Sequence, residues 1–256
     1  MLTVALIGPD GAGKTTISHR LVESLPWKVK YLYMGVNSDS SNRVLPTTAA
    51  IRAIKRACGV KPDAGGPSDL RRAQARPQGL IRGVARGAKS ALSLANRLCE
   101  EWYRQMLTWS YQWRGYVVLY DRHYFIDYFA YDIAPCEWRR PWARRIHGFW
   151  LNRVYPKPDL VIYLDAPSEV LFARKGEGTI DTLARRRNEY LELKDHVKCF
   201  AVVDADRPVD EVTHEVTSVI VDFHRGRNAG TWPRATASPS SATLEVAGAT
   251  TGEKKP

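Results

Sequence analysis

The residues from Gly8 to Thr15 combine the side chains and the spacing that bind a phosphate group. They read GPDGAGKT and fit the pattern G-x-x-x-x-G-K-[ST]. Glycines let the backbone N–H groups of such a loop turn inward toward an anion, and the N-terminus of a following helix adds a partial positive charge. The loop follows a sequence that predicts a strand and precedes one that predicts a helix. We therefore predict a phosphate-binding loop.

The loop predicts a site for a nucleoside triphosphate, with ATP and Mg²⁺ as the expected cofactors. Lys14 would reach the β- and γ-phosphates, and the Thr15 hydroxyl would ligate the metal. A glycine-rich turn without a ligand is the alternative interpretation. The predicted nucleotide-binding residues of the loop are Gly8, Pro9, Asp10, Gly11, Ala12, Gly13, Lys14, Thr15 and Thr16.

Two other apolar runs end in an aspartate. YVVLYD ends at Asp121 and is followed by Arg122, while LVIYLD ends at Asp165. Strand-terminal carboxylates reach the sheet edge where ligands bind in α/β folds, and an arginine can grip phosphate as a fork. Either aspartate could be the metal-side acid, and we favour Asp121, with Arg122 as a catalytic partner. A salt-bridged pair that closes the strand is the alternative for Asp121 and Arg122.

A cluster of basic residues follows the second of these runs. It surrounds the short flexible piece from Gly176 to Thr179 and consists of Arg174, Lys175, Arg185, Arg186 and Arg187. Arginines on a closing segment could screen the charge that develops on a transferring phosphoryl group and exclude water. We predict a lid with Arg174 as a catalytic residue and Arg185 and Arg186 as nucleotide-binding residues. A solvated basic helix is the alternative.

Five short apolar runs predict buried parallel strands, because Val, Ile, Leu and Tyr without polar alternation are typical of strands covered on both faces. They are Thr3–Gly8, Val29–Met34, Tyr116–Asp121, Leu160–Asp165 and Cys199–Asp204. Each is followed by helical or loop sequence, which predicts βαβ units. The expected fold class is α/β, a three-layer P-loop NTPase fold with a five-stranded parallel sheet flanked by helices, and with a lid segment.

Three helices have recognisable ends. The first runs from Ala91 to Trp113 and ends at Gly115, the second begins after a Ser168 cap and ends at Gly176, and the third runs from about Pro208 to Phe223. The first helix carries one predicted apolar face, made of Leu94, Leu98, Trp102, Met106, Trp109 and Trp113.

Two segments do not follow this alternation. Gly35 to about Pro77 is rich in Ser, Asn, Pro and Gly and predicts a mobile insert with short helices. The residues from about Arg225 to Pro256 have little to bury and predict a disordered tail. We expect one P-loop domain over residues 1–224, with a basic insert at about 36–90, and a disordered tail over residues 225–256.

The net charge of +11 comes mainly from the middle of the chain, where Arg and Lys dominate between Arg52 and Arg104. The segment is either a solvated basic face or a surface for a phosphate-bearing substrate or an anionic partner. No apolar run approaches membrane-spanning length, and the N-terminus lacks the basic start of a signal peptide. The four cysteines are far apart, which indicates reduced thiols. We expect a cytoplasmic protein.

Taken in order, these pieces resemble the thymidylate kinase family of the P-loop nucleoside monophosphate kinases. The resemblance depends on GPDGAGKTT, the long helix ending at Gly115, YDRH, PDLVIYLD with its arginine-bearing helix, and VVDADRPVDEV. It covers roughly Met1 to His224, except for the insert. It implies transfer of the γ-phosphate of ATP to a nucleoside monophosphate such as dTMP, giving dTDP and ADP.

The resemblance also implies roles for individual arginines. It makes Arg122 an anchor for the acceptor phosphate and Arg174 with Arg185–Arg187 the lid. Members of the family carry a phosphate-gripping arginine on the helix before the third strand. Arg97 and Arg104 lie on neighbouring turns of the matching helix here, so either could serve.

One stretch departs from the family pattern. After the second strand, members usually carry an Arg-Glu-Pro-Gly-Gly type sequence that helps to form the acceptor side, whereas this chain reads YMGVNSDSSNRVLPTT. A second hypothesis therefore keeps the mechanism and changes the small-molecule acceptor to a sugar or another metabolite. A third is an ATP-binding switch that docks on nucleic acid or a membrane surface. We expect no stable nucleic-acid complex, and the resemblance is compatible with a homodimer.

Overall fold

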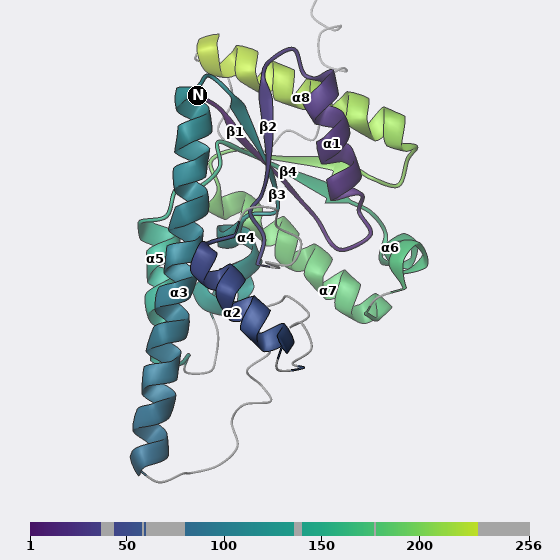
Figure 1. The fold of residues 1–256 in the computed structure, drawn as a ribbon. Helices are drawn as coiled ribbons and strands as arrows, with labels where there is room; N and C mark the ends of the chain where they lie inside the picture. The colour runs from purple at the N-terminus through teal and green to yellow at the C-terminus, as the bar shows by residue number, and fades with distance from the viewer. Residues whose placement is uncertain (37–43, 58, 60–79, 136–139, 177, 230–256) are drawn as a thin grey trace, which may run out of the picture.

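Five parallel strands form one sheet in the order β2-β3-β1-β4-β5 (Figure 1). They are β1 (Thr3–Ile7), β2 (Val29–Tyr33), β3 (Val117–Asp121), β4 (Leu160–Asp165) and β5 (Phe200–Asp204). This computed structural model describes residues 1–36, 44–57, 59, 80–135, 140–176 and 178–229. The five predicted strands and the α/β fold class are confirmed.

Helices cover both faces of the sheet. They are α1 (Lys14–Ser24), α2 (Pro46–Ala57), α3 (Leu80–Trp113), α4 (Tyr124–Tyr128), α5 (Trp142–Arg153), α6 (Ser168–Lys175), α7 (Ile180–Leu191) and α8 (Val209–Ala229). A π-helical turn, η3 (Phe129–Ile133), follows α4, and a 3₁₀ turn, η4 (Glu192–His196), follows α7. Helices α1 and α8 lie together on one side of the sheet, while α3, α4 and α5 lie on the other (Figure 1).

The pleat of the sheet divides the core into two clusters. Leu6, Leu119 and Ile162 point toward α1 and α8, where they meet Leu21 and Val216. The neighbouring strand positions point the other way and pack with α4 and α5; examples are Ile7, Tyr120, Tyr163, Phe125 and Leu151. Because successive strand residues face opposite sides, each strand-terminal side chain is assigned to one face of the sheet.

The long helix α3 differs from its prediction. It begins at Leu80, well before Ala91, and its expected apolar face is only partly buried, since Met106 is 54% exposed and Trp113 is 79% exposed. The side chains that α3 buries are mostly polar: Glu100, Glu101, Arg104, Gln105 and Thr108. The apolar periodicity did not predict the buried face, because the segments that pack against α3 present the carbonyls of Tyr33 and Gly35 and the ring of His147.

Two helix ends also need correction. Pro167, which has no side-chain hydrogen bond, caps α6, so Ser168 is not the cap but the first helical residue. Helix α8 continues to Ala229, so the residues from Arg225 to Ala229 are helical and do not belong to a disordered tail. Residues 230–256 of the predicted tail, and 37–43, 58 and 60–79 of the predicted insert, lie outside the described residues.

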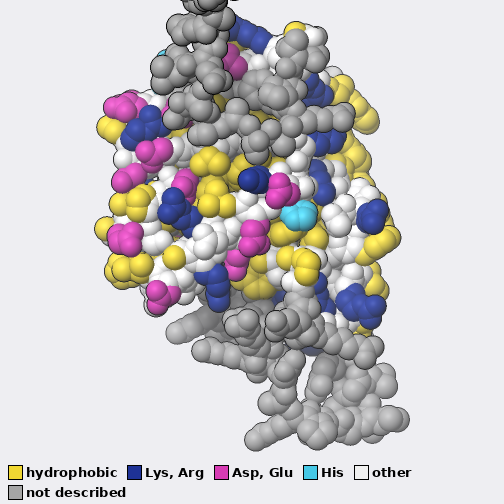
Figure 2. Space-filling model, turned by 180° about the vertical axis from the view of Figure 1, so that it is seen from behind, with side chains coloured by type: hydrophobic (Ala, Val, Ile, Leu, Met, Phe, Trp, Pro, Cys, Tyr) yellow, Lys and Arg dark blue, Asp and Glu magenta, His cyan; other side chains and the backbone are white. Residues whose placement is uncertain are grey.

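On the face shown in Figure 2, acidic and basic side chains lie interspersed over the coloured part of the surface. The structure does not describe the side chains of the basic residues from Arg52 to Arg86, so the choice between a solvated basic face and a surface for an anionic partner stays open. Within the described part of the chain, none of the helices has the length and apolar character that a membrane crossing requires.

Candidate functional site

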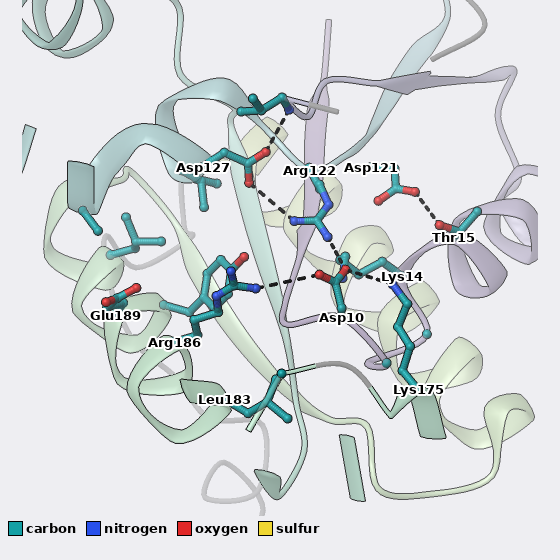
Figure 3. Close-up of a pocket in the computed structure, with 18 of the residues that line it drawn as sticks. Asp10, Lys14, Thr15, Asp121, Arg122, Asp127, Lys175, Leu183, Arg186 and Glu189 are labelled. Carbon is teal, nitrogen blue, oxygen red and sulfur yellow. Dashed lines mark hydrogen bonds and ion pairs between the residues drawn. The ribbon is translucent and has the colours of Figure 1, made fainter. Parts of the chain in front are cut away.

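The loop between β1 and α1 lines a cavity of about 990 Å³ beyond the carboxyl ends of the strands (Figure 3). Gly8, Gly11 and Gly13 have φ angles of 152°, 94° and 80°, which side-chain-bearing residues rarely adopt. A Cβ atom at Gly8 or Gly11 would also lie 2.8 or 2.9 Å from a backbone carbonyl oxygen. The loop therefore requires glycine for both its dihedral angles and its packing.

Lys14 opens α1, and its side chain is buried under this loop. Its Nζ donates to the carbonyl oxygen of Pro9 at 2.7 Å and lies 4.0 Å from Asp10 Oδ1. Burial lowers the pKa of Lys14 to about 7, and the Arg122 guanidinium acts in the same direction. An anionic ligand in the loop would oppose both effects and raise the pKa of Lys14, because a nearby negative charge favours the protonated lysine.

Asp121 ends β3 on the face of the sheet that carries α1. Its Oδ2 accepts hydrogen bonds from Thr15 Oγ1 at 2.7 Å and from the Tyr31 hydroxyl at 3.0 Å. Its Oδ1 is buried and has no hydrogen-bond partner among the described residues. An oxygen pair of this kind, a carboxylate with a free buried oxygen beside a hydroxyl, fits the hard-cation chemistry of Mg²⁺. Thr15 and Asp121 are therefore suited to hold the expected metal.

Asp165 ends β4 on the opposite face and is already paired. Arg187 of α7 donates to both of its carboxylate oxygens at 2.6 Å, and the Tyr163 hydroxyl donates to Oδ1 at 3.1 Å. The two strand-terminal aspartates therefore differ in their surroundings: Asp121 lies against the loop, and Asp165 holds the lid helix α7.

Arg122 is the only described residue other than glycine with a positive φ, at 66°. This strained backbone turns its guanidinium toward the loop, where Nη2 donates to Asp10 Oδ1 and Nη1 lies 3.8 Å from Asp127 Oδ1 (Figure 3). Burial by itself would lower the pKa of Arg122, but Asp127 and Asp10 more than compensate and raise it. The guanidinium therefore stays charged inside the cavity.

The lid residues reach the same carboxylate. Lys175 Nζ at the end of α6 lies 3.8 Å from Asp10 Oδ1, and Arg186 Nη1 on α7 lies 3.9 Å from Asp10 Oδ2. Burial would raise the pKa of Asp10, but Arg122 and the surrounding cations lower it. Together with Lys14 and Arg122, Asp10 thus has four cationic side chains around it, from α1, the end of β3, α6 and α7.

The other lid arginines have different surroundings. Arg174 lines the cavity and donates to the carbonyl oxygen of Ala205 at 2.9 Å. Arg185 is 62% exposed, lies 3.6 Å from Glu189, and is not among the residues that line the cavity. The structure thus brings Arg174 and Arg186 to the predicted site, and it leaves Arg185 on the outer side of α7.

Aromatic and apolar side chains also line the cavity. They come from β2 and the residues just after it, and from α4, η3, α7 and η4: Tyr33, Val36, Ile126, Phe129, Tyr131, Tyr190 and Leu193. Arg122, Asp127 and Glu189 are charged residues of the same lining. Burial raises the pKa of Asp127, although Arg122 opposes the shift. A flat, partly apolar acceptor with one anionic group would complement this surface.

Curated relatives of the chain are thymidylate kinases, although no family model matches it. A probable thymidylate kinase from Archaeoglobus fulgidus is 35% identical over 116 residues, which are 43% of this chain and 55% of that protein. A probable thymidylate kinase from Sulfolobus acidocaldarius is 33% identical over 81 residues, 28% of this chain and 42% of that protein. A thymidylate kinase from Leuconostoc mesenteroides is 27% identical over 237 residues, 85% of this chain and 93% of that protein.

The chain is therefore similar to thymidylate kinases. The chain spans about half the length of the two archaeal relatives, 42% and 55%, and most of the length of the bacterial one. Its sheet of five parallel strands with helices on both faces agrees with this relationship.

Two residues of the thymidylate kinase-like pattern are not at the cavity. Arg97 lies 4.0 Å from Asp132 and stacks over the Tyr128 ring, and Arg104 is fully buried among backbone carbonyls and Glu100. Neither is among the residues that line the cavity. The expectation that Arg97 or Arg104 grips the acceptor is therefore not met in this structure, because packing of α3 directs both side chains elsewhere.

Two residues that line the cavity were not predicted from the sequence. Tyr31 holds Asp121, and its own ring stacks on His19 of α1 at 4.9 Å. Asp127 follows Arg122 by five residues and faces its guanidinium. A separation of five residues is not a helical-pair spacing, so the sequence held no local signal for Asp127, and Tyr31 had the same appearance as any aromatic residue of a buried strand.

Proposed function

We propose that this chain transfers the γ-phosphate of ATP to a nucleoside monophosphate, with dTMP as the first acceptor to test. The observation that carries the proposal is that Lys14, Arg122 and Arg186 line one cavity around a glycine loop. Curated thymidylate kinase relatives support the nucleoside monophosphate kinase type of function. The identity of the acceptor rests on the resemblance alone.

On the donor side, the loop amides and Lys14 would bind the β- and γ-phosphates. Thr15 and Asp121 would hold Mg²⁺, which when bound neutralises charge on the phosphates being separated. The described contacts keep these groups in place before the ligand arrives: Tyr31 fixes Asp121, and Pro9 fixes Lys14. Little reorganisation is then needed at the moment of transfer, which is the main source of electrostatic catalysis.

On the acceptor side, Arg122 would bind the attacking phosphate and place it beside the loop. Arg186 and Lys175 would move from Asp10 to the transferring phosphoryl group, where they would offset its negative charge and exclude water. The attacking oxygen belongs to a phosphate that is already ionised at neutral pH, so this reaction needs no general base.

One observation favours a second acceptor class. Arg122 is flanked by Asp10 and Asp127, so its positive charge is largely balanced before any substrate binds. A neutral acceptor with a hydroxyl group would suit such a balanced pair, and the buried Asp127 could accept the hydroxyl proton. The acceptor screen therefore also includes sugars and other metabolites that carry a hydroxyl group.

The experiment is an acceptor screen that follows ADP release from the full chain. All nucleoside monophosphates, sugars and sugar phosphates are compared with a reaction without acceptor. We expect dTMP or another monophosphate to raise ADP release well above this background. We also expect Lys14→Met to abolish the increase, since loss of one preorganised electrostatic group typically costs about 2.7–4 kcal/mol. Turnover of sugars alone would replace the proposal by the second candidate, and turnover of nothing would refute both.

A further inference from the structure

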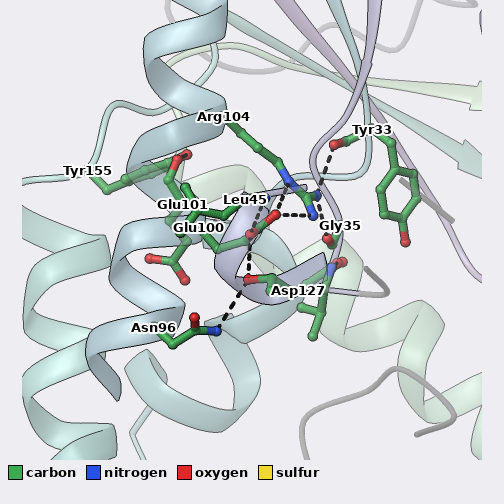
Figure 4. Close-up of polar contacts among 11 residues, drawn as sticks. Tyr33, Gly35, Leu45, Asn96, Glu100, Glu101, Arg104, Asp127 and Tyr155 are labelled. Carbon is green, nitrogen blue, oxygen red and sulfur yellow. Dashed lines mark hydrogen bonds and ion pairs between the residues drawn. The ribbon is translucent and has the colours of Figure 1, made fainter. Parts of the chain in front are cut away.

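Arg104 is fully buried and does not line the cavity. Its guanidinium forms hydrogen bonds with Tyr33, Gly35 and Glu100 (Figure 4). Its Nη1 donates to the carbonyl oxygens of Tyr33 at 3.0 Å and Gly35 at 3.1 Å. Its Nε and Nη2 donate to Glu100 Oε1 at 3.1 and 2.9 Å. A buried charge is costly unless it is paired and hydrogen-bonded, and these contacts offset that cost for Arg104.

The two carbonyls belong to the segment Tyr33–Val36 at the end of β2, and Tyr33 and Val36 of this segment line the cavity. Gly35 in this segment has no room for a side chain: a Cβ atom there would lie 2.5 Å from the Tyr33 hydroxyl and 2.7 Å from Arg122 Cδ. The aliphatic part of Arg122 therefore packs directly against the backbone that Arg104 holds.

A second contact joins the same segment to the Arg122 head group. The N–H of Val36 donates to Asp127 Oδ2 at 3.2 Å, and Asp127 Oδ1 lies 3.8 Å from Arg122 Nη1. Arg122 in turn donates to Asp10 in the glycine loop. Contacts between described residues thus connect Arg104 to the glycine loop, and Arg122 lies in the middle of this series.

Glu100 extends this chain of contacts in the other direction. Its Oε2 accepts hydrogen bonds from the N–H of Leu45 at 2.9 Å and from Thr48 Oγ1 at 3.0 Å, at the start of α2 (Figure 4). The Glu100–Arg104 pair therefore holds the described chain on both sides of residues 37–43. This is also the region where the sequence departs from the thymidylate kinase pattern.

We infer that Arg104 is a positioning residue for the acceptor site, and that it acts on Arg122 through the Tyr33–Val36 segment without touching the acceptor. Glu100 fixes Arg104 and ties α2 to the same point. The inference rests on the proposed function, because it gives Arg122 the task of binding the acceptor. It replaces the direct acceptor contact for which the resemblance offered Arg104 as one of two alternatives, beside Arg97.

The test compares Arg104→Lys, Glu100→Gln, Arg122→Lys and the double variant Arg104→Lys/Arg122→Lys. Arg153→Lys, an exposed site on α5, is the matched control. We expect Arg104→Lys and Glu100→Gln each to raise the acceptor KM about tenfold, with the ATP Kd changed by less than about twofold. The double variant should bind acceptor no more than about twofold worse than Arg122→Lys, because both changes act through one guanidinium.

Three results would overturn the inference. Fully additive losses in the double variant would show that Arg104 acts independently of Arg122. Unchanged or tighter acceptor binding in Glu100→Gln would mark Arg104 as a direct contact that Glu100 restrains. A parallel loss of melting temperature and ATP affinity, without a specific change in acceptor KM, would make the pair merely structural. Should Arg104→Lys fail to fold, Thr48→Ala weakens the same cluster without leaving a buried charge unpaired.

A second readout needs no acceptor and separates this inference from the proposed function. Amide hydrogen exchange should accelerate at Val36 and Leu45 in Arg104→Lys, while the β1 and β4 amides keep their protection. Unchanged exchange at both amides would show that Arg104 does not hold the Tyr33–Val36 segment, even if the wild-type protein is active. Conversely, accelerated exchange in a protein that phosphorylates no monophosphate would support this role of Arg104 and refute the proposed function.

Discussion

Replacing Lys14 by methionine should lower the number of protons that the protein takes up when it binds ATP. Burial lowers the pKa of Lys14 to about 7, from an ordinary value of 10.5. Nucleotide phosphates in the loop would favour the charged lysine and raise its pKa again. Binding above pH 7 therefore has to be accompanied by protonation of Lys14, and methionine, which has a similar length and no charge, cannot take up this proton.

The size of the effect follows from the pKa. With a value of about 7, Lys14 is protonated in about half of the molecules at pH 7 and in about one-tenth at pH 8. Charging the remainder at pH 8 costs about 1.4 kcal/mol, so ATP affinity should be about tenfold weaker than at low pH. Each further pH unit should weaken the affinity by about another factor of ten, until the pKa of the complex is reached.

Isothermal titration calorimetry measures both quantities. Titrations of ATP at pH 8 in buffers of different ionisation enthalpy count the protons taken up, and a series from pH 6.5 to 9 gives the slope, with the pH values chosen around the pKa of about 7. Lys14→Met corrects for protons that the nucleotide itself exchanges. We expect close to one more proton for the wild type than for the variant. Equal proton counts, or parallel pH profiles of the two proteins, would refute the assigned pKa and the role of Lys14.

Two further predictions concern the lid and a buried histidine. Arg186→Gln should lower kcat at least tenfold while Arg185→Gln stays within about twofold, because only the first lines the cavity; equal effects in a steady-state assay would contradict this placement. Burial alone would lower the pKa of His147, but its hydrogen bonds to Asp132 at 2.6 Å and Glu101 at 2.7 Å raise it. The stability that this proton supplies is fully present below about pH 6.5 and is lost as the pH rises through the raised pKa. The difference in unfolding free energy between wild type and His147→Gln should therefore shrink from pH 6 to pH 9 in urea titrations; a constant difference would show that the proton does not stabilise the fold.

Local sequence patterns were sufficient to predict the strands of the sheet and the glycine loop. Strands buried on both faces have to be continuous apolar runs, and the loop needs glycine at fixed positions, so both leave local signals. The bounds of β4, Leu160–Asp165, were predicted without error, and Gly8, Gly11 and Gly13 all have the positive φ angles that the motif demands. These features depend on neighbours that are close in the chain.

The direction of each functional side chain depended on tertiary structure. Asp121 and Asp165 look alike in the sequence, but the register of the sheet turns Asp121 to α1 and Thr15, and it turns Asp165 to α7 and Arg187. Arg104 lies on the helix where the resemblance expects a phosphate-gripping arginine. Its guanidinium nevertheless donates to the carbonyls of Tyr33 and Gly35, which are 71 and 69 residues earlier in the chain. Contacts between segments so far apart follow from how whole elements pack, and no local pattern of residues encodes that packing.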